Sequence, residues 1–524
     1  MSSKGNGIER RDFLKVLGAA GASATLAGCA NEPDRLIPYL VQPEEIVPGI
    51  STWYRTTCRE CPAGCGMTVR TREGRALKAD GNDGSPISHG KLCARGQASL
   101  HGLYDPDRIP QALVRDGDGW ARVSWDRAEQ TLADALRNAG GRAVLLSRPE
   151  ASSMDALLDE WTAALGVRRV RFDMFGHEPL RAAHRRLFGQ DALPIYDFEQ
   201  AATVISFGGD FLETFLSPVD YAHGFKEGHA YGNGRRGTFI WVSPHQSLTG
   251  LNADEWLAPR PGTEHLVALA LASLVAEETG RAAAPGVLDG LDPRQLAGTA
   301  GVDMERLQLA ARRFAEGPSV AVGPGVGTTH AAATTLATAV AALNDVAGNY
   351  GTTVRLGPSV ENQATHAEMA ELVRQMAAGE VSALLLHGPN PLYELADRDA
   401  VEAALAEVPF VASFSPWLDE TSERAHLLVP DHHFLESWGD YEPRPGIHSL
   451  VQPVMTPVFQ TKQAGDVLLS VARRAGAGLG TSATTFYDYL REQWQGIAGS
   501  AGGAAGGFDG WWTQALRDGV VVTT

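Results

Sequence analysis

Cysteine is scarce in this sequence. The chain has 524 residues and only five cysteines, which are Cys29, Cys58, Cys61, Cys65 and Cys93. An odd and sparse set of this kind is a poor disulfide framework for so large a chain. Four of the five nevertheless lie between Cys58 and Cys93, and this clustering indicates a site rather than scattered cross-links.

Long basic runs and long apolar runs are also missing. The formal net charge is −17, and no basic segment offsets it, which argues against a nucleic acid as the partner. A membrane-crossing helix needs about 20 consecutive apolar residues, and no window of the sequence approaches that length. With 44% apolar residues the chain is globular, and its length suffices for roughly two to four domains. No arrangement typical of a Ser-His-Asp hydrolase has support in the sequence.

The first 29 residues have the features of an export signal. The segment RRDFLK (residues 10–15) is followed by a short, weakly apolar run over Val16–Leu26. Twin arginines before such a run are typical of the Tat pathway, which exports folded proteins. The run ends in LAGC (residues 26–29), which is similar to a lipobox, although an ordinary signal end with an incidental cysteine is the alternative. We predict export to the extracytoplasmic face of the cytoplasmic membrane and a lipid anchor at Cys29.

The remaining chain divides into segments of different character. Residues 30–50 carry several prolines and predict an extended tether, and residues 51–110 combine the cysteines with short strand-like pieces. Farther along, short apolar strands alternate with helices, which predicts an α/β fold with more than one parallel sheet. The expected strands are 142–146, 203–207, 238–242, 319–322, 383–386 and 410–414, and the expected helices include 125–138, 264–278 and 331–346.

The cysteine spacing favours an iron–sulfur cluster. CRECPAGCG places Cys58, Cys61 and Cys65 in a C-x2-C-x3-C pattern, and Cys93 follows in KLCARG. Three thiolates on one tight loop and a distant fourth can hold the four corners of a [4Fe–4S] cube. Zinc more often uses two separated C-x2-C pairs, and it remains the main alternative, with disulfides as the third.

These motifs resemble the molybdopterin oxidoreductases of the complex iron–sulfur molybdoenzyme family. The likeness begins with the cysteine loop, KLCARG and PDRI, and continues in the same order to about residue 470. Within the family it is greatest to the molybdopterin-like subunit of alternative complex III, a membrane quinol oxidoreductase. The later matching segments are ADEWLAPRPGT (253–263), FGGDFLETFLSP (207–218), AALNDVAGNYG (341–351), HGPNPLYE (387–394) and LVPDHHFLESWGDYE (428–442).

The resemblance implies a molybdopterin oxidoreductase fold with Rossmann-like parallel-sheet domains. We expect an iron–sulfur module over residues 51–110, and we expect no C-terminal β-barrel domain, because the sequence stops before one could fit. The remaining expected parts are a first α/β domain split over 111–140 and 345–475, a second α/β domain over 141–344, and a C-terminal helix with a Gly/Ala linker tail over 476–524.

The resemblance also assigns residues around the cluster and around a pterin. In active relatives the segments that match ADEW and RPGT bind the pterin nucleotide, which implicates Asp254, Gly262 and Thr263 if a pterin is bound. Otherwise these residues only hold a strand-to-helix loop. Arg95 stands two residues after Cys93, where relatives carry a Lys or Arg between cluster and pterin. Its positive charge would stabilise a reduced cluster.

The sequence departs from the catalytic members at the metal ligand. Active members bind the metal of a bis-pterin cofactor through a cysteine, selenocysteine, serine or aspartate. No cysteine is free for this role, and Asp173 is the only plausible family-type ligand in the matching region. The alternative interpretation is that Asp173 is an ordinary polar residue, as are His177, Glu178 and His184, at the start of a helix or on its surface. We therefore do not expect a molybdenum bis-(molybdopterin guanine dinucleotide) cofactor.

Together these features predict an iron–sulfur electron-transfer subunit of a membrane-associated quinol oxidoreductase. The resemblance implies three kinds of partner: a ferredoxin-like iron–sulfur subunit, quinone-binding integral membrane subunits and a haem cytochrome subunit. Two alternatives stay open, a catalytic molybdenum or tungsten subunit that reduces polysulfide, thiosulfate or another oxyanion, and a structural scaffold subunit. The clustered cysteines count against a purely structural role.

Overall fold

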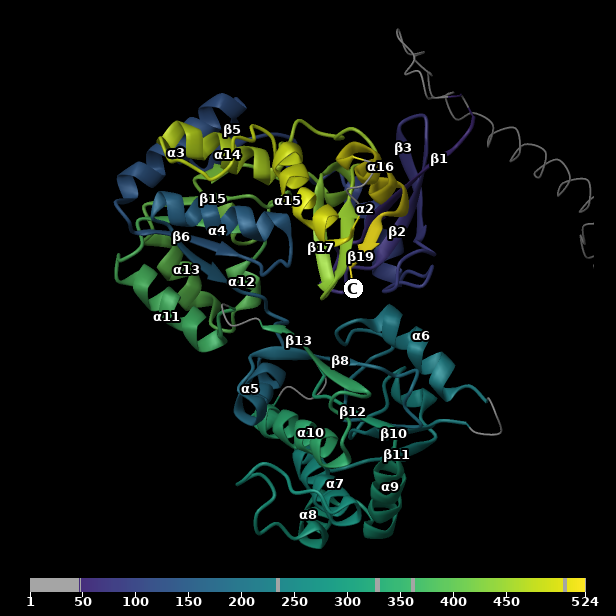
Figure 1. Cartoon of the computed structure of the whole chain (residues 1–524). Helices are drawn as coiled ribbons and strands as arrows, with labels where there is room; N and C mark the ends of the chain where they lie inside the picture. Colours follow the sequence, from purple (N-terminus) through teal and green to yellow (C-terminus); the bar gives the residue numbers. More distant parts are fainter. Residues whose placement is uncertain are drawn as a thin grey trace, which may run out of the picture. The chain divides into compact units, whose positions relative to one another are not determined.

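The computed structural model of this chain describes residues 47, 49–231, 236–325, 330–359, 363–502 and 507–523. The predicted export signal, the predicted anchor Cys29 and nearly all of the predicted tether lie outside these residues. The chain divides into two units, residues 1–50 and residues 51–524, and the fold described below is that of the second (Figure 1).

The cysteine-containing module is a three-stranded antiparallel sheet with one helix. The strand order is β1 (Thr52–Thr57), β2 (Gly66–Arg72), β3 (Arg75–Gly81), and helix α2 covers Ala94–Leu103. In β2 the buried side chains of Met67, Val69 and Thr71 alternate with less buried ones, as expected where one face of a sheet meets a core. The two predicted strand-like pieces, residues 67–71 and 76–79, lie within β2 and β3.

A seven-stranded sheet forms the centre of the first α/β domain. Its order is β5-β4-β16-β15-β14-β6-β7, and the five strands from β16 to β7 run parallel, while β4 and β5 form an antiparallel edge. The strands are β4 (Leu113–Asp116), β5 (Gly119–Arg122), β6 (Ala143–Ser147), β7 (Arg168–Arg171), β14 (Ala383–His387), β15 (Phe410–Ser413) and β16 (Leu427–Leu428).

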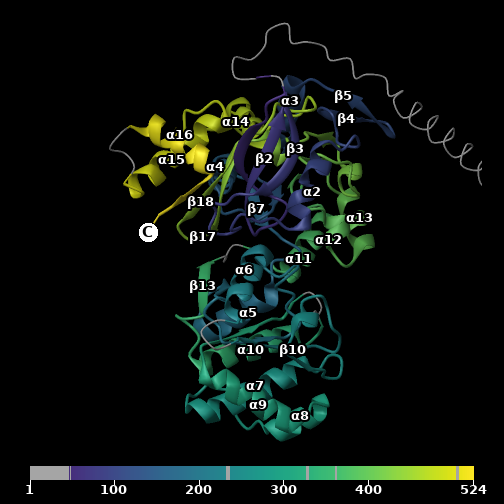
Figure 2. The ribbon, with the colours of Figure 1, turned by 90° about the vertical axis from the view of Figure 1, so that its right-hand side faces the viewer.

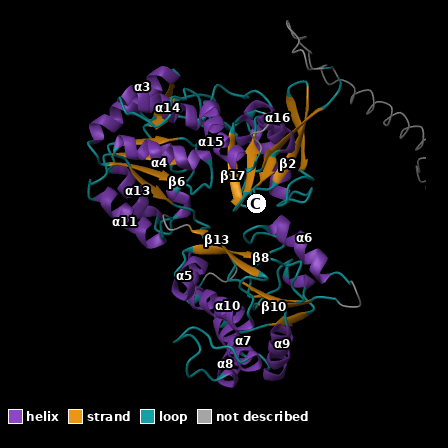
Figure 3. Ribbon diagram, in the orientation of Figure 1, coloured by secondary structure: helices purple, strands orange, loops and turns teal. Residues whose placement is uncertain are grey.

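Helices cover both faces of this sheet (Figure 3). Leu145 and Leu385 point into a core with α3 (Trp125–Ala139), α4 (Ser153–Leu165) and α14 (Ala464–Ala475). Their strand neighbours Leu146 and Leu384 point to the opposite face, because side chains alternate along a strand. That second face packs against α11 (His366–Ala377) and α13 (Arg398–Ala406), and the short helix α12 covers Pro391–Glu394.

The observed strand pairings place both boundaries of the second domain differently from the prediction. Strand β6 pairs in parallel with β14, and β7 pairs with β6, so the first domain extends to Arg171 rather than ending at residue 140. At the other boundary, β13 (Val354–Ser359) pairs antiparallel with β8 (Ala192–Tyr196), so the second domain continues past residue 344. A short strand can enter either of two sheets, and only its long-range partner decides which.

The second domain is built on a four-stranded parallel sheet of order β11-β10-β9-β12. Its strands are β9 (Thr203–Ser206), β10 (Thr238–Val242), β11 (Glu255–Leu257) and β12 (Ser319–Val322). One face packs against α7 (Glu264–Thr279), α8 (Pro293–Ala300) and α9 (Met304–Glu316), which lie together in Figure 2. The other face packs against α5 (Glu178–Phe188) and α6 (Pro218–His229), and α10 (Ala333–Ala347) contributes to both cores.

The C-terminal segment is more than the helix and linker that the sequence predicts. Helix α15 (Phe486–Ser500) includes the first part of the Gly/Ala-rich stretch, and α16 (Phe508–Asp518) follows. Strand β19 (Val520–Val522) then pairs antiparallel with β18 (Ile447–Val451), which also pairs with β17 (Gly439–Arg444). Within the part of the chain that the structure describes, no helix has both the length and the apolar character needed to cross a membrane.

Candidate functional site

The four clustered cysteines come from two loops of the N-terminal module. Cys58, Cys61 and Cys65 lie between β1 and β2, where the Cys58 N–H donates to the Cys65 carbonyl at 2.9 Å and closes the loop on itself. Cys93 occupies the position directly before α2. All four thiols are free, with Cys58 and Cys65 buried and the other two half-buried. The predicted cluster ligands are therefore all reduced cysteines.

The thiols lie within electrostatic reach of one another. Burial raises the pKa of Cys58 to about 12, and the neighbouring Cys61 and Cys93 add to the rise. Burial also raises the pKa of Cys65, and Cys58, Cys61 and Cys93 raise it further. Thiols that resist ionisation in this way are deprotonated when a metal binds, because only the thiolate is a ligand. Among the described residues no three His, Cys, Asp or Glu converge where one metal ion could be held.

The donor set fits a [4Fe–4S] cluster. Four free thiols that approach each other from two loops match the ligand number of the cube. The Arg59 Nη1 group, on the residue after Cys58, is buried without a hydrogen-bond partner among the described residues. An anionic cluster would supply the acceptor that this donor lacks. Such a cluster accepts and gives up single electrons.

A strand from the far end of the chain fixes the cysteine loop. The Tyr441 hydroxyl in β17 donates to the Pro62 carbonyl at 2.7 Å. Its ring occupies the space beside Gly64, where an added Cβ would lie 2.5 Å from Tyr441 Cδ1. Gly64 also has a φ of +62°, a conformation that favours glycine. The Arg59 guanidinium carbon lies 4.0 Å from the centre of the same ring.

The loop that leads to Cys93 is fixed separately. The Ser88 hydroxyl donates to the Gly66 carbonyl at 2.8 Å, and Gly66 has no room for a side chain because an added Cβ would lie 2.5 Å from Ser85 Cβ. His89 stacks on His223 with ring centres 4.0 Å apart, and its Nε2 lies 3.1 Å from Asp220 Oδ1. These contacts attach the loop to α6 of the second domain.

Asp220 is a residue that the sequence analysis missed. It pairs with Arg444 of β17 as well as with His89, and its negative charge is among the causes that raise the pKa of Cys65. Tyr441 and Arg59 were missed in the same way. Tyr441 and Arg444 lie in or near the matched segment 428–442, yet no spacing in the sequence connects them with the cysteines.

The predicted residue Arg95 lies beside the cysteines. It is exposed in the first turn of α2, two residues after Cys93. Burial raises the pKa of Cys61, and the positive charges of Arg95 and Arg59 act against that rise.

The predicted pterin-nucleotide residue Asp254 has protein partners for both of its oxygens. Oδ2 accepts from His229 Nε2 at 2.8 Å and from the Phe239 N–H at 2.9 Å, and Oδ1 pairs with Arg236 at 2.9 Å. Burial alone would raise the pKa of Asp254, but these hydrogen bonds and charges lower it overall. In this structure Asp254 therefore fixes the start of β10 to the end of α6.

Gly262 and Thr263 lie in the loop between β11 and α7. Gly262 has a φ of +80° with open space where a side chain would be, and the Thr263 hydroxyl donates to the Arg260 carbonyl at 2.6 Å. Glu264, the first residue of α7, is buried and pairs with His330 at 3.1 Å. Gly262 and Thr263 thus lie in a strand-to-helix loop, as expected from the sequence.

Asp173 takes part in an ion-pair network. Its Oδ1 accepts from the Phe175 N–H at 3.0 Å and lies 3.5 Å from Arg148, which also pairs with Glu394 at 2.6 Å. Burial raises the pKa of Glu394, although Arg148 opposes the rise. The network lies at the carboxyl ends of β6, β7 and β14, the edge where parallel sheets bind ligands.

His177 and Glu178 are at a helix start, as expected, but His184 is not a surface residue. His177 precedes α5 with a φ of +48°, and burial lowers its pKa to about 4. His184 is buried in α5, where its ring nitrogens bond to the Ala192 carbonyl at 3.0 Å and the Tyr350 hydroxyl at 3.1 Å.

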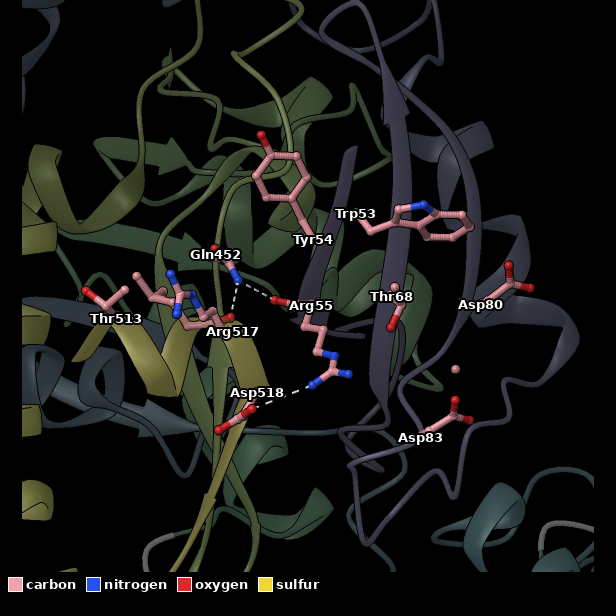
Figure 4. Close-up of a pocket in the computed structure, with 12 residues that line it drawn as sticks. Trp53, Tyr54, Arg55, Thr68, Asp80, Asp83, Gln452, Thr513, Arg517 and Asp518 are labelled. Carbon is pink, nitrogen blue, oxygen red and sulfur yellow. Dashed lines mark hydrogen bonds and ion pairs between the residues drawn. The ribbon is translucent and has the colours of Figure 1, made fainter. Parts of the chain in front are cut away.

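Helix α16 closes over the outer strand of the cysteine module (Figure 4). Gln452 Nε2 donates to the Arg55 carbonyl at 2.6 Å and to the Leu516 carbonyl at 2.8 Å, while Arg55 pairs with Asp518 at 3.7 Å. These residues border a cavity of about 710 Å³ that also includes Trp53, and none of the predicted site residues lines it. The cavity therefore marks where the C-terminal helix meets the module.

The fold and the cysteine site define a class of protein. A family model described as Molybdopterin oxidoreductase matches residues 108–474, and a model described as Molybdopterin oxidoreductase Fe4S4 domain matches residues 51–105. The chain belongs to the molybdopterin oxidoreductase family. The Fe4S4 match supports a [4Fe–4S] cluster at the four cysteines, and the longer match runs against our expectation that no pterin is bound.

Two individual proteins illustrate the similarity within the family. The chain is 29% identical over 518 residues to the menaquinone reductase molybdopterin-binding-like subunit of Nitratidesulfovibrio vulgaris, covering 92% of this chain and 74% of that subunit. It is 27% identical over 244 residues to the arsenate respiratory reductase molybdopterin-containing subunit of a Shewanella species, covering 44% of this chain and 28% of that protein.

A solved structure shares the fold. Acetylene hydratase from Pelobacter acetylenicus superposes with a TM-score of 0.65 and 16% sequence identity, over 81% of this chain and 69% of that one. The expected α/β architecture with parallel sheets is thereby confirmed.

Proposed function

We propose that this chain is an iron–sulfur electron-transfer subunit of a membrane-associated quinol oxidoreductase complex. The observation that carries the proposal is the set of four free cysteines on two loops, each of which is held by hydrogen bonds to other parts of the fold. The similarity of nearly the whole chain to a menaquinone reductase subunit supports the same role, since quinones are the redox partners in such complexes.

The chain's own residues would hold and shield the redox group. Cys58, Cys61, Cys65 and Cys93 bind it, and the Tyr441 hydroxyl holds the loop that carries three of them. Burial of Cys58 and Cys65 keeps water away from the sulfurs. The positive charge of Arg95 faces this region from α2 and would favour the reduced state.

The proposal includes partners and a location. An alternative complex III-like assembly would supply a ferredoxin-like iron–sulfur subunit, quinone-binding integral membrane subunits and a haem cytochrome subunit. The twin-arginine segment and Cys29 would place the chain at the extracytoplasmic face of the cytoplasmic membrane, held by a lipid. Expression of a C29S variant tests the anchor: loss of detergent partitioning of the isolated subunit is expected, and unchanged partitioning contradicts it.

A second candidate is a subunit that also binds a pterin cofactor. The observation that favours it is the molybdopterin oxidoreductase match over residues 108–474. Gly262, Thr263 and the carboxyl edge that carries Arg148 would then face the cofactor, and the partners of Asp254 and Asp173 would have to rearrange.

Metal analysis of the protein purified from its native membrane decides between these functions. About four iron atoms per chain without molybdenum or tungsten are expected for the electron-transfer subunit. Molybdenum or tungsten near one atom per chain would establish the second candidate instead. If the purified protein contained neither iron nor molybdenum, only a scaffold role would remain. A C65S variant that kept all its iron would contradict the assignment of the four thiols as cluster ligands.

A further inference from the structure

Arg59 is a half-buried cation with one buried N–H group left unpaired. It follows Cys58 in the loop between β1 and β2, and 19% of its side chain is exposed. Its Nη2 donates to Glu150 Oε2 at 3.1 Å, and its guanidinium is stacked on Tyr441. Its Nη1 has no hydrogen-bond partner among the described residues. A buried donor without an acceptor destabilises the fold, so an acceptor that belongs to the functional state is expected beside it.

The location of Arg59 couples its charge to the cysteines. Arg59 directly follows Cys58, and the Tyr441 ring on which its guanidinium stacks also lies against Gly64, between Cys61 and Cys65. Reduction of a [4Fe–4S] cluster adds one electron, and therefore one negative charge, to the group that these thiolates hold. A fixed positive charge nearby stabilises that added charge and raises the reduction potential.

Arg59 and Arg95 differ in their exposure to solvent. Arg95 is exposed on α2, two residues after Cys93, whereas 19% of the Arg59 side chain is exposed. Dissolved salt screens exposed charges beyond a Debye length of about 10 Å at 0.1 M, and it screens buried charges much less. The contribution of Arg95 to the potential should therefore shrink with salt, whereas that of Arg59 should persist.

We propose that Arg59 is a positioning residue that sets the reduction potential of the cluster independently of salt, with Glu150 as the counter-charge that limits its effect. Tyr441 contacts both the charge and the ligand loop, because its ring stacks on the Arg59 guanidinium and its hydroxyl donates to the cysteine loop at Pro62. The proposal rests on the iron–sulfur function given above and adds to it the residues that tune the electron transfer.

The test is the midpoint potential of the cluster in the full-length protein, followed by electron paramagnetic resonance during redox titration. R59Q is expected to lower the potential. E150Q is expected to raise it, because Arg59 then lacks its counter-charge. The R59Q/E150Q double variant should lie closer to the wild type than either single variant. R59K keeps the charge and should shift the potential less than R59Q.

A salt series separates the two arginines. The difference between R59Q and the wild type should be the same at low and high ionic strength, whereas the difference between R95Q and the wild type should shrink at high ionic strength. R424Q is the matched control, because Arg424 forms an exposed ion pair with Glu402. Its potential should equal that of the wild type.

Three outcomes overturn the proposal. The first is an unchanged potential in both R59Q and E150Q, and the second is a shift of the same sign in both, which would indicate a loosened loop. The third is an R59Q effect that disappears in high salt. If the R59Q protein binds no iron, the E150Q variant alone tests the proposal. An E150Q midpoint potential that is not higher than that of the wild type then overturns it. Wild-type protein without iron would instead defeat the proposed function.

Discussion

Arg108 and Glu436 form a two-point ion pair whose side chains are both fully buried. The Arg108 Nη2 donates to Glu436 Oε2 at 2.7 Å and its Nη1 to Oε1 at 3.3 Å, across 328 positions of sequence. The pair joins the end of the cysteine module to the segment that leads into β17. It therefore connects the two parts of the chain that build the site.

Breaking this pair should destabilise the protein strongly. We expect E436Q to lower the free energy of unfolding by about 3–5 kcal/mol, because it leaves the Arg108 charge buried and unpaired. Chemical denaturation followed by tryptophan fluorescence measures the loss. E402Q, which breaks the exposed pair with Arg424, is the control and should cost at most about 1 kcal/mol. Equal effects of the two substitutions would contradict the importance of burial.

Gly64→Ala should impair iron binding. The added Cβ would lie 2.5 Å from the Tyr441 ring, and the residue has a φ of +62°, so the loop must move away from β17. We expect the purified variant to contain less than half the iron of the wild type. Gly476→Ala changes a residue with a φ of +75° and open space beside it, at the end of α14, and should keep its iron. Full iron content in the Gly64 variant would show that the Tyr441 contact does not fix the loop.

His433 should make stability depend on acidity. Burial lowers its pKa to about 4, and the neighbouring charge of Arg108 lowers it as well. An unfolded histidine has a pKa near 6.5, so the unfolded state binds the extra proton first as the pH falls. Stability is then constant above about pH 6.5 and decreases between about pH 6.5 and 4, by up to about 3 kcal/mol.

The variant that tests this dependence is His433→Asn. The His433 Nδ1 accepts from the Leu435 N–H at 3.3 Å, and asparagine offers an acceptor for the same bond. Thermal unfolding over this pH range should show a shallower decline in the variant than in the wild type. Parallel curves would assign the acid sensitivity to other groups.

Asp254→Asn should reduce stability without loss of iron. The hydrogen bonds from His229 and Phe239 lower the pKa of Asp254 in spite of its burial. An acid with a lowered pKa stabilises the fold above its unfolded pKa of about 3.9, and this contribution is lost as the pH falls through the folded pKa. The substitution should cost about 1–3 kcal/mol at neutral pH and weaken the dependence on acid. An unchanged melting temperature would indicate that Asp254 has no structural role.

The sequence predicted local features better than distant ones. The six strands predicted after residue 120 match β6, β9, β10, β12, β14 and β15, because the signal of each lies within a few residues. Tyr441 was missed because the contact between its hydroxyl and Pro62 spans 379 positions. The domain boundary near residue 141 was wrong for the same reason, since the pairing of β6 with β14 is not visible in either strand alone.

Burial explains the other differences. His184 lies four residues after Leu180, on the buried face of α5, and the Ala192 carbonyl and Tyr350 give both of its ring nitrogens partners inside the protein. A polar residue can be buried when such partners exist, and a single sequence does not show them.

The interlocking of the two chain ends has a consequence for synthesis on the ribosome. Thr56 at the end of β1 bonds to Gln452, which follows it by 396 positions. At about 5–20 residues per second, translation of that stretch takes on the order of 20–80 s. During this interval the thiols are present without β17, β18 or α16 to enclose them. The cysteine loop is therefore more open to a metal donor before the polypeptide is complete than afterwards, when Cys58 and Cys65 are buried.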